Sequence, residues 1–98
     1  DYTVLSTDSG TYFKAFNTGD HTVRFDPTSL NSGIDWIVIN CNADGGSIQI
    51  TRGTAVTFNV KGITEQSGST LTIEEGGAVF IKKNSANNYD VIGDIVIP

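Results

Sequence analysis

The chain has 98 residues, with six basic and eleven acidic side chains, one histidine and a formal net charge of -5 at pH 7. A chain of this length builds one compact core, and we expect a single β-domain over residues 1–98 that is a module of a longer chain. The acidic balance argues against nucleic-acid binding, because affinity for phosphate backbones comes from Lys and Arg. No apolar run approaches the ~20 residues that span a bilayer, so no membrane insertion is expected. Cys41 is the only cysteine, which excludes an internal disulfide.

Short runs of β-branched and aromatic residues, separated by Gly, Asn, Asp and Ser, predict strands throughout the chain. In the first half, residues 2–5 form a first strand, and residues 12–16 and 22–25 are predicted to pair as a hairpin. Residues 36–39 are apolar at every position. A continuous run of this kind is typical of a central strand that is covered on both faces.

The second half predicts further strands at 47–51, 55–60, 70–73, 78–82 and 89–92. Residues 52–54 form the turn between the first two of these strands, and residues 74–77 are a four-residue hairpin connection. About nine or ten short strands in one chain predict an all-β fold. We expect a small antiparallel β-sandwich or a partly closed barrel.

Three segments, 36–39, 79–81 and 92–97, carry apolar residues at consecutive positions, which is more than a sheet with one buried face requires. Self-association would cover the surplus. The predicted oligomer interface consists of Trp36, Ile37, Val38, Ile39, Val79, Phe80, Ile81, Ile95 and Ile97.

Asn40, Asn42 and Asp44 follow the N-x-N-x-D-G order with which a calcium-binding loop begins. The twelfth position of such a loop would be Thr51 rather than a bidentate Glu, and the flanking segments are strands. An ordinary hairpin turn is therefore the preferred interpretation, and we expect neither a metal nor another cofactor.

The reactive side chains are scattered. His21 is the only histidine, and nothing in the sequence delivers Cys41 or a serine to it as a nucleophile. Glu74 and Glu75 are adjacent, so on a strand they point to opposite faces and make a poor pair for glycosidic-bond cleavage. The sequence therefore predicts a protein that is not an enzyme, with a small hydrolase as the least favoured class.

Exposed aromatic residues leave one alternative open. Tyr2, Tyr12, Trp36 and Tyr89 offer flat apolar faces with a polar group at the edge. Trp36, however, lies in the apolar run that is predicted to be buried, and cross-strand packing is the preferred interpretation of the tyrosines. A planar row of such side chains would favour a carbohydrate-binding β-sandwich module of a secreted protein.

Several segments occur in a characteristic order: 2–5 followed by 8–10, 16–19 leading into 22–27, 48–50 before 54–56, 68–73, and the ending 89–94. This order resembles a family of β-rich modules in the virion proteins of tailed bacteriophages, found in tail fibres, head fibres and capsid decoration proteins. The resemblance implies a non-enzymatic building block of the virion that assembles as a homotrimer. Its partners would be other virion proteins or a host cell-surface glycan.

Overall fold

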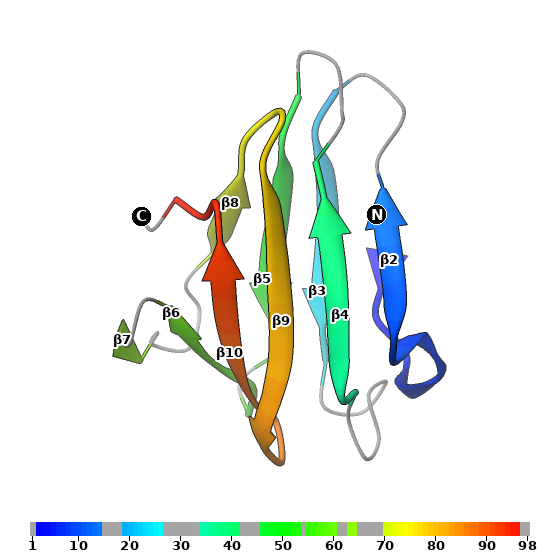
Figure 1. The fold of residues 1–98 in the computed structure, drawn as a ribbon, viewed down its shortest axis with the longest axis vertical. Coiled ribbons are helices and arrows are strands. Elements are labelled where there is room, and N and C mark those ends of the chain that lie inside the picture. The colour runs from blue at the N-terminus through cyan, green and yellow to red at the C-terminus, as the bar shows by residue number, and fades with distance from the viewer. Residues whose placement is uncertain are drawn as a thin grey trace.

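A computed structural model describes residues 2–14, 19–26, 34–41, 46–53, 55–60, 63–64 and 70–96. Ten strands in this part of the chain form two sheets that lie in layers (Figure 1). The four-stranded sheet has the order β1 (Tyr2–Thr3), β3 (His21–Phe25), β5 (Ile48–Arg52) and β8 (Leu71–Ile73). The six-stranded sheet has the order β2 (Thr11–Lys14), β4 (Trp36–Asn40), β9 (Ala78–Ser85), β10 (Asn88–Gly93), β6 (Thr57–Val60) and β7 (Ile63–Thr64).

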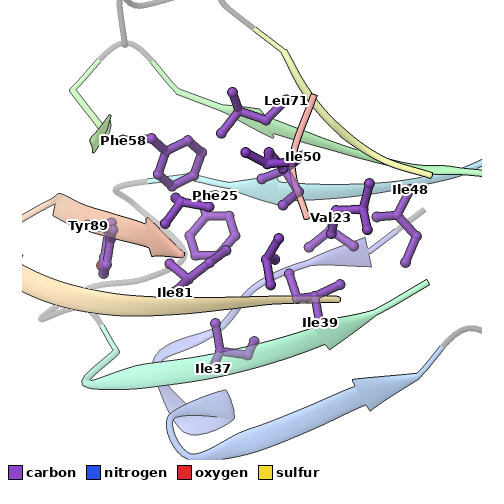
Figure 2. Close-up of a cluster of buried hydrophobic side chains, with 14 of the residues drawn as sticks. Val23, Phe25, Ile37, Ile39, Ile48, Ile50, Phe58, Leu71, Ile81 and Tyr89 are labelled. Carbon is purple, nitrogen blue, oxygen red and sulfur yellow. The ribbon is translucent and has the colours of Figure 1, made fainter. Parts of the chain in front are cut away.

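The facing sides of the two sheets enclose one apolar core (Figure 2). This core forms because inward-pointing apolar residues alternate with outward-pointing residues along the strands. In β5, Ile48 and Ile50 point inward while Gln49 is exposed. At its centre, the Phe25 ring from the four-stranded sheet meets Phe58 edge-on at 5.1 Å and lies 5.7 Å from Tyr89, both from the six-stranded sheet. The prediction of an all-β sandwich is confirmed, and the sheets do not close into a barrel.

The strand pairing is mixed rather than purely antiparallel. In the four-stranded sheet, β1 and β5 both run parallel to β3. In the six-stranded sheet, β2 is parallel to β4 and β10 is parallel to β6, whereas β9 is antiparallel to both of its neighbours. The parallel pairs arise because the chain places successive strands on alternate sheets, so strands in the same sheet often run in the same direction.

The predicted hairpin of residues 12–16 and 22–25 is wrong, because β2 and β3 belong to different sheets. The turns at 52–54 and 74–77 likewise lead from a strand of one sheet to a strand of the other. A hairpin does join β9 to β10, and its turn contains Asn87 with φ of 56°, a left-handed conformation that Asn tolerates.

The residues of the predicted oligomer interface do not share one face, because successive residues of a strand point to opposite sides of the sheet. Four of its members are buried in the core of the chain itself, so the single chain already covers them: Ile37, Ile39, Val79 and Ile81. Figure 2 labels Ile37, Ile39 and Ile81 within the core cluster. Ile95 is also buried, and Ile97 lies outside the described residues. Trp36, Val38 and Phe80 point to the opposite side of the same strands.

The first strand is tied to the 3-10 turn Ser6–Asp8 by one carboxylate. Asp8 Oδ2 accepts hydrogen bonds from the Tyr2 hydroxyl at 2.6 Å and from the Leu5 backbone N–H at 2.8 Å. The hydrogen bond to Asp8, with smaller contributions from burial and from the negative charge, raises the pKa of Tyr2 to about 12. Burial also raises the pKa of Tyr89.

This contact predicts a loss of stability at high pH. The folded-state pKa of Tyr2 exceeds its unfolded value of about 10, so the stabilisation is fully present below pH 10 and is lost as the pH rises toward 12. In the Asp8→Asn variant, the Tyr2 resonance followed by NMR of ring-labelled tyrosine should titrate near pH 10. An unchanged titration of Tyr2 in that variant would contradict the assignment to Asp8.

Candidate functional site

The outer face of the six-stranded sheet carries a continuous row of apolar side chains. Tyr12 of β2 is in register with Val38 of β4, Val38 with Phe80 of β9, and Phe80 with Ile92 of β10. These four residues form the apolar row. Its ends are the most exposed, with 57% of Tyr12 and 61% of Ile92 accessible to solvent, while Val38 and Phe80 are half-buried between their neighbours. The row therefore crosses four adjacent strands on a face where the described residues leave its two ends exposed.

Trp36 lies beside the apolar row, on the same face of β4 and two residues before Val38. Its ring centroid is 5.9 Å from that of Phe80, with 32° between the ring planes. The Gly10 backbone also lies close to the indole, and its N–H donates to the Trp36 carbonyl at 2.7 Å. The side chain therefore has two neighbours, yet 38% of the residue remains exposed.

A group of polar side chains follows Trp36 across the sheet. Trp36 is in register with Lys82, Lys82 with Asp90, and Asp90 with Asn59. Asp90 Oδ1 accepts hydrogen bonds from Asn59 Nδ2 at 3.2 Å and from Asn84 Nδ2 at 3.3 Å. We call Asn59, Lys82, Asn84 and Asp90 the polar corner. It places an ammonium group on the strand next to Trp36, and a carboxylate and two amides farther along the same face.

This face differs in charge from the rest of an acidic chain. Among the outward side chains that the structure describes on it, Asp90 is the only carboxylate, and Lys82 is its register neighbour. The other described acidic residues lie outside the strands: Asp8, Asp20, Asp26, Asp35, Glu74, Glu75 and Asp94. Counted over its described side chains, this face is close to neutral although the chain carries a net charge of -5.

The reactive side chains considered from the sequence lie apart from this face. His21 begins β3 on the other sheet, and Cys41 is fully buried with its Sγ 3.9 Å from the Gly46 carbonyl oxygen. Glu74 and Glu75 are exposed in the turn before β9, where with Asp94 they line an open pocket of about 450 Å³.

The candidate calcium loop is only partly visible. Asn40 ends β4, while Asn42 and Asp44 lie outside the described residues. Among the residues that the structure does describe, no group of three or more His, Cys, Asp or Glu side chains could hold a metal ion.

Sequence reasoning placed Trp36, Val38 and Phe80 in an interface but missed the continuity of the row. Tyr12 was an isolated aromatic candidate, and Ile92 belonged only to an apolar segment near the end of the chain. Both are joined to the row through strand register, which depends on which strands pair. Strand parity alone would have separated Trp36, Val38 and Phe80 from their buried neighbours.

No protein-family model matches this chain, and no curated protein or solved structure matches it. No helix in the described part of the chain is long and apolar enough to cross a membrane.

Proposed function

We propose that this chain is a non-enzymatic structural module of a tailed-bacteriophage virion, part of a capsid decoration or of a head or tail fibre. In this proposal it assembles as a homotrimer and attaches to the capsid, to a neighbouring fibre or to the host surface. The single observation that carries the assembly role is the apolar row Tyr12–Val38–Phe80–Ile92 on the open face of the six-stranded sheet. The phage context rests on the resemblance in segment order.

The composition of the face supports a role in protein contacts. Interface centres are rich in aromatic residues and poor in charge, and they are surrounded by a polar rim. Here the apolar row would form the centre, and Trp36 and the polar corner would lie at the rim. Complete burial of one such side chain stabilises by about 1.5–3 kcal/mol, so the exposed parts of several together contribute appreciably to association.

A three-fold assembly would also explain how weak contacts become useful. A cyclic trimer repeats each surface three times around one axis. Three identical sites then engage a repetitive surface together, and the avidity exceeds the affinity of one site.

The assembly is tested by a change at the exposed end of the apolar row. Light scattering over a concentration series reaching below micromolar should give the mass of a trimer for the unmodified chain. The Ile92→Asp variant places a carboxylate without a partner in the apolar contact and should raise the dissociation constant at least 100-fold, about 2.7 kcal/mol. Because Ile92 is 61% exposed, the variant should keep the circular dichroism spectrum of the folded chain.

Val96→Asp is the matched control, since Val96 is also an exposed aliphatic residue but bridges to β8 at the edge of the other sheet. It should leave the mass unchanged. A monomer at every concentration, or equal effects of the two variants, would contradict the proposed interface. The phage context is tested separately by mass spectrometry of purified particles of the phage that encodes the chain.

A further inference from the structure

We propose that Trp36 and the polar corner form a binding site for a neutral glycan, with a pyranose ring stacked on the indole. This inference rests on the proposed attachment role of the same face and names the chemistry of what is attached. Asn84 and Asp90 would bind the sugar hydroxyls. The site lies beside the apolar row rather than within it, so it can act at the rim of an assembled particle.

The indole is a suitable platform because it is exposed and fixed at the same time. The Phe80 ring lies beside it and the Gly10 backbone, just before β2, approaches it, while more than a third of the residue remains accessible. Aromatic rings present a flat apolar surface to ligands that are apolar on one side and polar at the edge. A side chain that is already ordered loses little conformational entropy when the ligand binds.

The hydrogen-bonding groups of the polar corner are also positioned in advance. Asn59 Nδ2 donates to Asn88 Oδ1 at 2.5 Å as well as to Asp90, and Asn84 donates to the same Asp90 oxygen. These contacts orient the amide planes. Among the residues that the structure describes, no hydrogen bond engages Asp90 Oδ2 or Asn84 Oδ1, so both oxygens can accept bonds from hydroxyls. Two strand spacings, about 9.5 Å, separate Trp36 from Asp90 along the register row, which suits a disaccharide-sized segment.

The charge of the site favours a neutral ligand over an anionic one. Lys82 lies between Trp36 and Asp90 in register, so the ammonium and the carboxylate offset one another within the site. The chain as a whole carries a net charge of -5, which repels polyanions at long range. Ligand sites of this kind combine an apolar surface with a few convergent polar groups that fix the orientation.

The test uses the fluorescence of Trp36, which is the only tryptophan in the chain. The full chain is titrated with cellohexaose, maltohexaose, laminarihexaose and chitohexaose, and with hexagalacturonate as the anionic comparison. At least one neutral hexasaccharide should give a saturable emission change, confirmed by calorimetry, and hexagalacturonate should bind more weakly. Asn84→Ala should raise the dissociation constant about tenfold, and Trp36→Ala should abolish the calorimetric signal.

Gln49→Ala is the matched control, because Gln49 is an exposed amide on the outer face of the other sheet. It should bind like the unmodified chain. The glycan site is overturned if none of the four neutral hexasaccharides gives a saturable change, if hexagalacturonate binds best, or if Asn84→Ala and Gln49→Ala behave alike.

The experiments distinguish failure of the glycan site from failure of the proposed assembly. A trimer that ignores all five sugars would overturn the glycan site and leave the assembly standing. A monomer whose sugar binding depends on Trp36 and Asn84 would overturn the assembly and support a carbohydrate-binding module that acts alone.

Discussion

Replacing Ile37 by aspartate is expected to unfold the protein, whereas the same replacement at Val38 is expected to leave it folded. The two residues are neighbours on β4 and point in opposite directions. Ile37 is completely buried between the sheets, and Val38 is half-buried on the outer face. Both substitutions replace an aliphatic side chain with aspartate, so the difference in stability between the two variants reports which face of the sheet each residue occupies.

The cost at Ile37 has two parts. Removing the packed aliphatic side chain costs about 2–5 kcal/mol. A carboxyl group without a partner in the core adds several kcal/mol, whether it stays ionised or takes up a proton. Together these terms are comparable with the whole stability of a small domain, about 5–15 kcal/mol.

Circular dichroism and urea unfolding of both variants provide the measurement. Ile37→Asp should show no cooperative transition, and Val38→Asp should show one. Because Val38 belongs to the apolar row, its aspartate should also weaken the proposed assembly without loss of fold. A cooperative transition of normal stability in Ile37→Asp would mean that the inner face of β4 is not the core side.

The sequence patterns located the strands well but did not identify their partners. Alternation in 48–51 requires one buried face, and the structure provides it by burying Ile48 and Ile50. The same alternating pattern buries its apolar residues in either of two arrangements. The next strand can pair with this one in the same sheet, or it can lie opposite, across the core, in the other sheet. The turns at 52–54 and 74–77 were therefore recognised as turns, yet both cross between sheets instead of closing hairpins.

Sequence patterns were equally limited in predicting which residues share the outer face of the six-stranded sheet. The uninterrupted apolar run 36–39 predicted a strand covered on both faces. The prediction holds for the inner face, where Ile37 and Ile39 are buried, but Trp36 and Val38 on the outer face remain partly exposed. Treating the whole run as an intersubunit surface combined two different environments.

Tyr12 and Ile92 join that surface only through the register of β2 with β4 and of β9 with β10. β9 and β10 are joined by a hairpin, so their pairing is local. The pairing of β2 with β4, which are far apart in sequence, is set by packing of the complete sandwich. No local pattern in either segment determines it.

Replacing Gly93 by alanine is the second substitution with a large expected effect. Gly93 ends β10 opposite Val79 and has φ of 130°, a conformation that side chains strongly disfavour. A Cβ there would collide with the carbonyl oxygen of Ala78 and come within 3.0 Å of Val79 Cα. That carbonyl already accepts a hydrogen bond from the Asp94 N–H at 3.0 Å, so moving it would break the contact after β10.

Backbone strain of this kind costs about 1–3 kcal/mol, and the collision adds to it, so the unfolding free energy should fall by more than about 3 kcal/mol. Gly76→Ala is the matched control. Its φ is also positive, at 84°, but no atom lies within 4 Å of an added Cβ, so the loss should be only about 1–2 kcal/mol. Urea unfolding of both variants measures the difference. Equal losses would show that the close approach of β9 to the end of β10 is not a constraint, because backbone conformation alone would then account for both values.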